Sequence, residues 1–417
     1  MLKTNNKIIS DNTYQYHRLP NGIGIVFKRN SSIVAHSGIF INVGSRDEDK
    51  KHEGIAHFIE HSIFKGTTHR KTYHILNRID GVGGELNAYT NKEETCIYAS
   101  ALAQHLERCL ELFADIIFNS TFPQKEIEKE KEVVLDEINS YKDTPSELIF
   151  DEFEELFFGN HALGHNILGN EKNIRQFTSN ELSSFIHNNY TTDKMIISVI
   201  GNVDFDKVIK LCMKYFGDRP ASSSKVKRYA PECCNNFAKE KNKHIHQTHA
   251  LIGCQAYNTY SNKKVAFTLL NNILGGPALN SRLNIGIREK YGLCYNIESQ
   301  YTPLSDSGIF YIYVAMDKEF KDRIIELIFR EINRLKNIRL TNLQLSAAKQ
   351  QLIGQLAINE ESALNEMLAM GKAYMNFNKV DSLEEINRDI MAITSEEIQD
   401  IANEIFIEDN FSKLFYF

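Results

Sequence analysis

Two histidines and a glutamate within residues 54–61 (GIAHFIEH) have the types and spacing of a metal-dependent hydrolytic centre. If this segment is helical, His57 and His61 lie one turn apart on the same face, and Glu60 lies beside them. Two imidazoles so placed can take two corners of a tetrahedral zinc site, and a nearby carboxylate can hold a water. The order His-x-x-Glu-His is the inverse of the more common His-Glu-x-x-His zinc-protease helix.

Such a pair needs a third protein ligand, and catalytic zinc sites commonly use a carboxylate there. Residues 125–138 (KEIEKEKEVVLDEI) are amphipathic and predict a helix, on which Glu130 and Glu137 lie two turns apart along one face. The alternating Lys and Glu of this run are also typical of a solvated helix face with i,i+4 ion pairs. That interpretation is favoured for its other glutamates, Glu126, Glu128 and Glu132.

With these residues in place, the sequence resembles the pitrilysin/insulinase family of inverted-motif zinc metallopeptidases. Glu137 follows His61 by 76 positions, close to the family's spacing, and the resemblance makes it the third metal ligand. Glu130 matches the family's accessory Glu one heptad earlier, outside the ligand set. The resemblance extends through residues 83–95 (GGELNAYTNKEET) and covers essentially the whole chain, with the mitochondrial-processing-peptidase-like branch as the nearest match.

The resemblance implies an α+β fold of two related domains. Each would be a largely antiparallel β-sheet covered by helices, and the two would form a clam-shell pair with one Zn²⁺ per chain. The sequence itself gives weaker support for such a duplication, because a strand followed by a helix is predicted in each half, and each half ends in a polar turn and a β-rich strand. These features fall at residues 35–43, 55–65 and 192–200 in the first half and at 248–256, 263–274 and 408–417 in the second.

A polar segment with Pro, Ser and Lys but no sustained periodicity marks the boundary between the halves. We therefore predict a zinc-binding catalytic domain at residues 1–217, a linker at 218–243 and a related domain without metal at 244–417. Near the start of the first domain, residues 15–28 predict a β-hairpin that turns at Pro20-Asn21-Gly22.

Composition excludes several other classes of protein. The net charge of −6 and the pI near 6.2 do not indicate the excess of positive charge that binding to nucleic acid or anionic membranes requires. The N-terminal residues lack the apolar core of a secretion signal, and no apolar run reaches the length of a membrane span. Seven scattered Cys do not form a disulfide framework, so a reduced cytoplasmic location is expected.

The second half lacks the histidine motif but contains an Arg and a Tyr seven residues apart, Arg288 and Tyr295. In the family that the chain resembles, such a pair reaches across to the zinc domain. An Arg can bind peptide carbonyls, and a Tyr hydroxyl can donate to a developing oxyanion. The alternative is that Arg288 pairs with Glu289 on the surface and that Tyr295 packs on a strand.

Residues 84–90 (GELNAYT) alternate as a strand, which the resemblance places at the edge of a sheet beside the metal. An edge strand can bind an extended peptide by β-augmentation, so Glu85, Leu86, Asn87 and Ala88 are candidate substrate-binding residues. The alternative is that this strand pairs on both sides inside the sheet.

Together these features predict a zinc endopeptidase that hydrolyses unfolded peptides or precursor segments, with His57, His61 and Glu137 as ligands and Glu60 as the base. Tyr295 and Arg288 would assist the reaction. The alternative from another class is a non-catalytic structural subunit, or the partner subunit of a heterodimeric peptidase. Because one chain carries both the motif and the Arg/Tyr pair, a homodimer is expected, without nucleic-acid or membrane partners.

Overall fold

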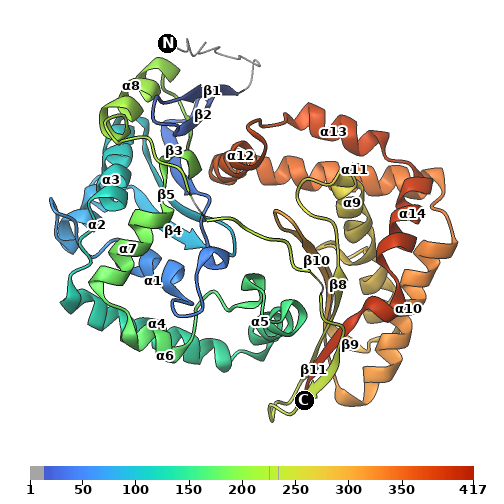
Figure 1. Cartoon of the computed structure of the whole chain (residues 1–417). Helices are drawn as coiled ribbons and strands as arrows, with labels where there is room; N and C mark the ends of the chain where they lie inside the picture. The colour runs from blue at the N-terminus through green and yellow to red at the C-terminus, as the bar shows by residue number, and fades with distance from the viewer. Residues whose placement is uncertain (1–13, 225, 233) are drawn as a thin grey trace. The chain divides into compact units, whose positions relative to one another are not determined.

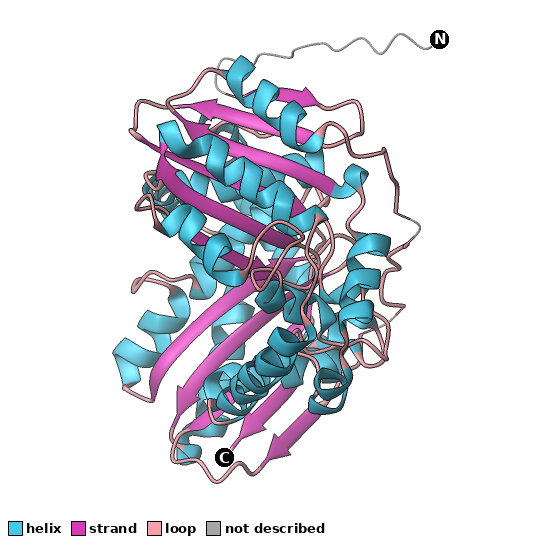
Figure 2. Ribbon diagram, turned by 90° about the vertical axis from the view of Figure 1, so that its left-hand side faces the viewer, coloured by secondary structure: helices cyan, strands magenta, loops and turns pink. Residues whose placement is uncertain are grey.

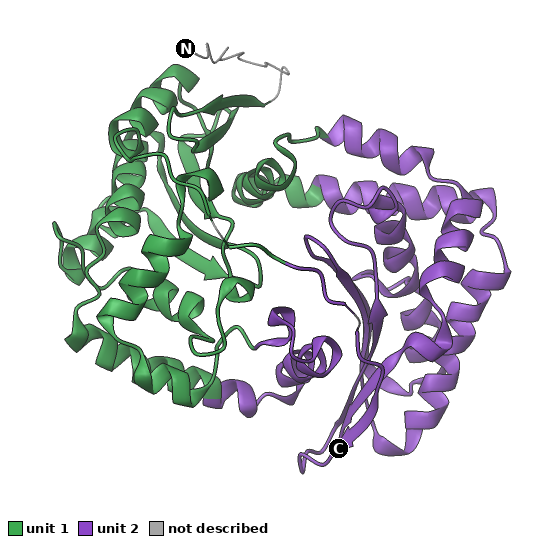
Figure 3. Ribbon diagram, viewed as in Figure 1, with its two compact units in different colours: residues 1–138, 166–228, 358–382 green, residues 139–165, 229–357, 383–417 purple. Residues whose placement is uncertain are grey.

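A computed structural model describes residues 14–224, 226–232 and 234–417 (Figure 1). Over these ranges the chain divides into two compact units, each assembled from separate stretches of sequence (Figure 3). Unit 1 contains the residues up to 138 together with 166–228 and 358–382, and unit 2 contains 139–165, 229–357 and 383–417. Among the helices of the described ranges, none combines the length and apolar character that crossing a membrane requires.

Unit 1 is built on a six-stranded sheet with the order β1-β2-β6-β3-β5-β4. All neighbours are antiparallel except β2 and β6. The predicted hairpin is confirmed, because β1 pairs with β2 around a turn in which Gly22 adopts a positive φ of 101°. The strands are β1 (Gln15–Arg18), β2 (Gly24–Arg29), β3 (Val34–Ile41), β4 (Glu85–Thr90), β5 (Thr95–Leu102) and β6 (Met195–Gly201).

Helices cover both faces of this sheet, in agreement with the nearly continuous burial of its central strands β2, β3 and β6. Phe40 and Ile196 pack against α12 on one face, while α3 and α8 pack against the strands as well. The helices of unit 1 are α1 (Ile55–Ser62), α2 (Thr72–Asp80), α3 (Leu106–Phe118), α4 (Gln124–Lys142, whose last turn enters unit 2), α6 (Glu171–Gln176), α7 (Ser179–Asn189), α8 (Phe205–Phe216) and α12 (Ala363–Phe377). Short 3₁₀ turns are η1 (Ser45–Asp47), η2 (Ala103–His105) and η4 (Thr192–Lys194).

Unit 2 has a five-stranded sheet with the order β7-β11-β8-β10-β9, again with helices packed on it (Figure 2). Its strands are β7 (Ala238–Lys241), β8 (Thr248–Gln255), β9 (Cys294–Pro303), β10 (Gly308–Met316) and β11 (Ser412–Tyr416). Its helices are α5 (Pro145–Phe158), α9 (Lys264–Gly275), α10 (Lys321–Asn337), α11 (Asn342–Glu360, whose end enters unit 1), α13 (Leu383–Ala392) and α14 (Ser395–Ile405). Shorter turns are η3 (Ala162–Gly164), η5 (Asn284–Glu289), η6 (Lys318–Phe320) and η7 (Glu408–Asn410).

The two sheets share one topology, which confirms that the halves are related. The order β2-β6-β3-β5-β4 in unit 1 corresponds strand for strand, in chain order as well as in space, to β7-β11-β8-β10-β9 in unit 2. In each, one parallel pair is followed by antiparallel neighbours. The histidine-bearing helix α1 follows β3 as α9 follows β8.

Each sheet is covered on one face by a helix from the other half of the sequence. Helix α5 of the first half lies in unit 2, where Ile149 and Phe153 pack with Leu251 and Tyr311. Helix α12 of the second half lies in unit 1, on β2, β3 and β6. The compact units therefore differ from the predicted continuous division at 1–217 and 244–417. The apolar face of a helix shows in its sequence, but the sheet that will cover it does not.

The predicted linker at 218–243 also contains a short strand. Residues 238–241 form β7, which pairs in parallel with β11 at the edge of the second sheet. This strand is mostly exposed, so it has no apolar alternation by which the sequence could have indicated it. Its backbone hydrogen bonds come from a partner at the far end of the chain.

The contact between α12 and β3 is tight enough to give a stability prediction. A Cβ added at Gly371 would lie 2.1 Å from a ring carbon of Phe40, which is completely buried. We expect Gly371→Ala to destabilise the protein by about 1–3 kcal/mol through overpacking, measured as a lower urea midpoint. Gly354, in the middle of α11, has nothing within 4 Å of such a Cβ. Gly354→Ala is the matched control and should be neutral or stabilising by up to about 1 kcal/mol; equal losses in both variants would contradict the packing argument.

Candidate metal centre and family membership

The motif helix α1 is preceded by the N-cap residue Gly54, whose φ of 93° is a left-handed conformation that favours glycine. A side chain there would also collide with Gly169, whose Cα lies 2.7 Å from the Cβ position. The buried carboxylate of Glu48 accepts hydrogen bonds from the backbone N–H groups of Gly54 and Ala56, each at 2.8 Å. These contacts fix the start of the helix and therefore the direction of its histidines. The role of Glu48 was not predicted, because no local sequence pattern links it to the motif.

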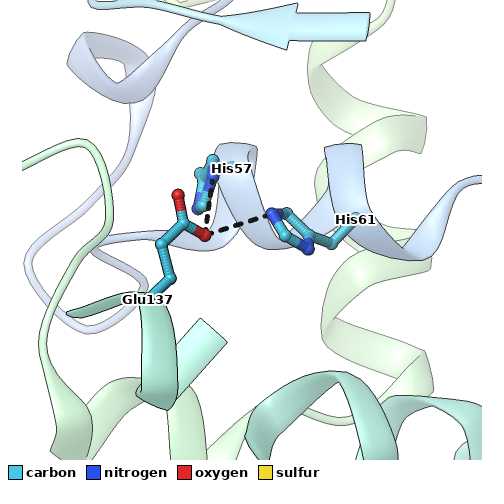
Figure 4. A group of neighbouring side chains, drawn as sticks. All are labelled: His57, His61 and Glu137. Atoms are coloured by element: carbon cyan, nitrogen blue, oxygen red, sulfur yellow. Dashed lines mark ion pairs between the residues drawn. The ribbon is translucent and has the colours of Figure 1, made fainter. Parts of the chain in front are cut away.

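The three predicted ligands meet in unit 1 (Figure 4). The Nε2 atoms of His57 and His61 lie 3.7 and 3.3 Å from the same oxygen of Glu137, Oε2. The ligand atoms of the three side chains all lie within 4.8 Å of one another. Helix α1 supplies both imidazoles and α4 supplies the carboxylate, so two elements that are distant in sequence converge on one point.

The chemistry of this group fits a divalent cation such as Zn²⁺. Burial and the neighbouring His61 lower the pKa of His57 to about 4, so His57 is neutral and keeps a lone pair for a metal. The carboxylates of Glu130 and Glu137 raise the pKa of His61 to about 9, which shows that the surroundings favour positive charge. Two imidazoles and a carboxylate form a donor set that catalytic zinc sites use.

Glu130 lies behind His61 rather than among the three ligands. Its Oε2 is 3.6 Å from Nδ1 of His61, and its Oε1 is 2.7 Å from Nζ of Lys65. A carboxylate at Nδ1 favours the tautomer that leaves Nε2 free for a metal and orients the ring. Glu130 was predicted to lie outside the ligand set. Lys65 was not predicted, although it stands four residues after His61 and could have been noticed from that spacing.

The position of Glu130 gives a prediction about metal affinity. We expect Glu130→Gln to weaken Zn²⁺ binding by about 10- to 100-fold, because His61 loses the carboxylate that orients it. Competition with a chromophoric chelator measures the change. Glu128 lies nearby on the solvent-facing side of α4 and pairs with Lys131 at 2.9 Å. Glu128→Gln should leave the affinity unchanged, and a similar loss in that control would mean that net charge alone sets the affinity.

Glu60 has the environment of a proton acceptor. Its Oε2 is buried and makes no hydrogen bond to any described residue. Burial raises the pKa of its carboxyl group, and Thr90 and His61 oppose part of this rise. A carboxylate with a raised pKa and a free buried oxygen can take a proton from a water and pass it on.

Strand β4 carries the predicted substrate-binding residues at the edge of the first sheet. Within the described residues, its single strand partner is β5. Glu85 and Asn87 are exposed, while Leu86 and Ala88 are half-buried. Helix α1 packs against this strand, and Thr90 at its end lies near Glu60. Next to the histidine motif, this edge therefore has no second strand partner among the described residues, although the backbone N–H of Ala88 donates to Oδ1 of Asn87 over 2.9 Å.

Arg288 and Tyr295 belong to unit 2 rather than to the unit that carries the histidines. Nη1 of Arg288 lies 3.4 Å from Oδ1 of Asn284 and 3.4 Å from Oε1 of Glu289, so the predicted surface ion pair is present. The hydroxyl of Tyr295 donates to Asp317 over 3.5 Å, and its side chain is 62% exposed. Within their own unit both side chains are accessible, as contacts to a substrate would require.

Comparison with known proteins decides the family. Residues 25–171 match the insulinase family (peptidase family M16), and residues 176–352 match the peptidase M16 inactive domain. An uncharacterised zinc protease of Bacillus subtilis, YmxG, is 35% identical over 390 residues, which cover 93% of this chain and 95% of that protein. The chain belongs to the M16 family.

Other M16 relatives extend the comparison. The β subunit of the mitochondrial-processing peptidase of Blastocladiella emersonii is 30% identical over 95% of this chain and 86% of its own length. This similarity supports the processing-peptidase-like branch. The crystal structure of a protease from Helicobacter pylori superposes with a TM-score of 0.88 at 21% identity, covering 97% of this chain and 99% of that one. At this identity the likeness concerns the fold, which is the two-domain α+β fold of M16 proteins.

Proposed function

We propose that this protein is a zinc-dependent endopeptidase that hydrolyses unfolded peptides or flexible precursor segments. The observation that carries the proposal is the convergence of His57, His61 and Glu137, with Glu60 beside them on α1. Membership in the M16 family and similarity to proteins named zinc proteases support the same function.

The mechanism assigns a task to each group of residues. His57, His61 and Glu137 would hold one Zn²⁺ per chain, and a zinc ion so bound lowers the pKa of a water and polarises a carbonyl. Glu60 accepts the proton of the attacking water at its free oxygen and delivers it to the leaving amine. Glu130 keeps the ring of His61 oriented.

Substrate positioning follows from the free edge of β4. An extended peptide pairs with the backbone of residues 85–88, where recognition depends on main-chain hydrogen bonds and tolerates many sequences. Segments inside a folded domain are already paired, so unfolded chains and flexible segments are the expected substrates. We assign Tyr295 to donation onto the developing oxyanion and Arg288 to binding a peptide carbonyl.

Because one chain carries the ligands, the base and the Arg/Tyr pair, we propose a homodimer of complete chains in the cytoplasm, without nucleic-acid or membrane partners. Light scattering on the protein expressed alone tests this assembly. A monomer that becomes active only with another subunit would contradict it.

The deciding experiment measures zinc content and hydrolysis of a quenched-fluorescent unstructured peptide on the same preparation. We expect about one zinc per chain, loss of activity with a chelator, and recovery when zinc is restored. Zinc without hydrolysis of any of several unfolded peptides would favour the non-catalytic subunit. Absence of zinc from protein that has been supplied with it would overturn the site.

A further inference from the structure

Unit 2 contains a pocket lined by several cationic side chains that the proposed peptidase chemistry does not use. It has a volume of about 450 Å³ and lies between the segment around η5, the C-terminal end of α10 and the start of α11. A smaller pocket of about 220 Å³ adjoins it, since Asn280, Arg282 and Gln344 line both. Arg282 is thus the charged side chain common to the two cavities.

The charges around the larger pocket are mainly positive, although the whole chain carries −6. Four cationic side chains line it against one carboxylate, Glu331; they are Arg282, Lys290, Arg334 and Arg339. Arg334 pairs with Glu331 at 2.7 Å, and Arg339 pairs with Glu396 at 2.8 Å. Arg334 and Arg339 therefore have carboxylate partners within the protein. Arg282 and Lys290 form no ion pair with a described carboxylate.

Arg282 makes no hydrogen bond or ion pair with any described residue, although its side chain is only partly exposed. Burial and the nearby charge of Arg334 both lower the pKa of Arg282. Glu331 raises this pKa but does not outweigh them. Lys290 lies over the ring of Tyr291 at 5.2 Å and has no carboxylate partner among the described residues. A partly buried guanidinium without a partner is unfavourable in the free protein and becomes favourable when an anion binds.

The neighbouring residue supplies a second, independent observation. Ser281 is 3% exposed, lines the smaller pocket, and its Oγ has no hydrogen-bond partner in the described structure. Buried hydroxyls are normally satisfied, so the free hydroxyl of Ser281 beside an unpaired Arg offers a hydrogen-bond donor to a ligand. Ile285 and Ile338, which are 50% and 64% exposed, line the larger pocket and offer apolar surface to the rest of such a ligand.

We propose that the two adjoining pockets together form a binding site for a phosphate-type dianion, held by Arg282, which lines both, with Ser281 in the smaller pocket and Lys290 in the larger one. Two uncompensated cations match a doubly charged group better than a carboxylate. A guanidinium binds phosphate oxygens through two parallel N–H donors, and a Ser hydroxyl adds a third. The ligand is either free phosphate or a small phosphate ester whose organic part contacts the two isoleucines.

Isothermal titration at constant ionic strength tests the proposal with three probes: inorganic phosphate, phenyl phosphate and benzoate. We expect saturable binding of at least one phosphate probe, one site per chain, and at least tenfold weaker binding of benzoate. Tighter binding of phenyl phosphate would identify an ester, and equal affinities would identify the free ion. Absence of saturable binding of both phosphates, or equal binding of benzoate, would overturn the proposal.

Variants distinguish phosphate binding in this pocket from phosphate binding elsewhere on the protein. Arg282→Gln should weaken binding by about tenfold or more, and Ser281→Ala by a smaller factor, because each removes a donor. Arg323 lies on α10 outside the pocket and pairs with Glu326 at 2.6 Å, so Arg323→Gln is the matched loss of charge and should change nothing. If Arg282→Gln does not fold, Lys290→Gln tests the same site. Binding that requires zinc and persists in Arg282→Gln belongs to the metal centre and contradicts the assignment.

Discussion

Replacing Glu60 with Gln should lower kcat/KM for an unstructured peptide by about 10²- to 10⁴-fold while one zinc per chain remains bound. The amide keeps the size of the side chain but cannot accept the proton of the attacking water. Oε2 of Glu60 is buried and has no hydrogen-bond partner among the described residues, so in the wild-type protein it is free to accept that proton. The loss should appear in kcat more than in KM, since Glu60 acts on the water rather than on peptide binding.

Further measurements on the same variant show whether the expected loss of activity arises from the chemistry of Glu60. Zinc content and the urea midpoint should match wild type, which separates a chemical defect from a folding defect. Glu132→Gln removes an exposed carboxylate of α4, 72% accessible, and should keep full activity. Turnover at the wild-type rate in Glu60→Gln would remove Glu60 from the mechanism and leave the three ligands without an assigned base.

Glu137→Gln should abolish both zinc binding at micromolar concentrations and all peptidase activity. A neutral amide replaces the carboxylate whose Oε2 lies within 3.7 Å of both imidazoles, so the site loses its anionic donor. His61 would also lose one of the carboxylates that raise its pKa, and Glu130 and Glu60 would remain to favour its charge. Zinc content after dialysis against a buffered metal solution measures the effect.

The adjacent residue provides the control. Asp136 precedes Glu137 on α4 but is exposed, so Asp136→Asn changes the net charge equally without touching the three ligands. That variant should keep zinc and activity. If Glu137→Gln binds zinc as tightly as wild type, the third ligand is another residue, and Glu130 is the first candidate because it already contacts His61.

Much of the candidate centre could be predicted from local sequence because its geometry is local. Two histidines four residues apart share a face in any helix, so the relation between His57 and His61 needed only a helical segment. The amphipathic pattern of residues 125–138 predicted α4 and placed Glu130 and Glu137 along one of its faces. Which of these glutamates would reach the histidines followed from the family resemblance, since 76 residues of chain separate Glu137 from His61.

Other parts of the structure depend on contacts between segments that no local pattern connects. The carboxylate of Glu48 caps α1, and Lys65 holds Glu130, through contacts that exist only after the chain has folded. The unpaired Arg282 and the orphaned hydroxyl of Ser281 look like ordinary polar residues in the sequence. Their significance comes from their burial and from the absence of a partner among the described residues.

By itself, the sequence determined the individual elements. These are the hairpin, the helix that carries His57 and His61, the acidic helix α4, and the repeated strand–helix order of the two halves. The tertiary structure decided which helix packs on which sheet and which strands pair. Helix α5 packs on the second sheet, α12 packs on the first, and β7 pairs with the last strand of the chain. The physical reason is that periodicity records which face of an element is apolar, whereas the hydrophobic effect that buries this face is not directional. The identity of the covering partner is therefore fixed by shape and chain connection over the whole fold.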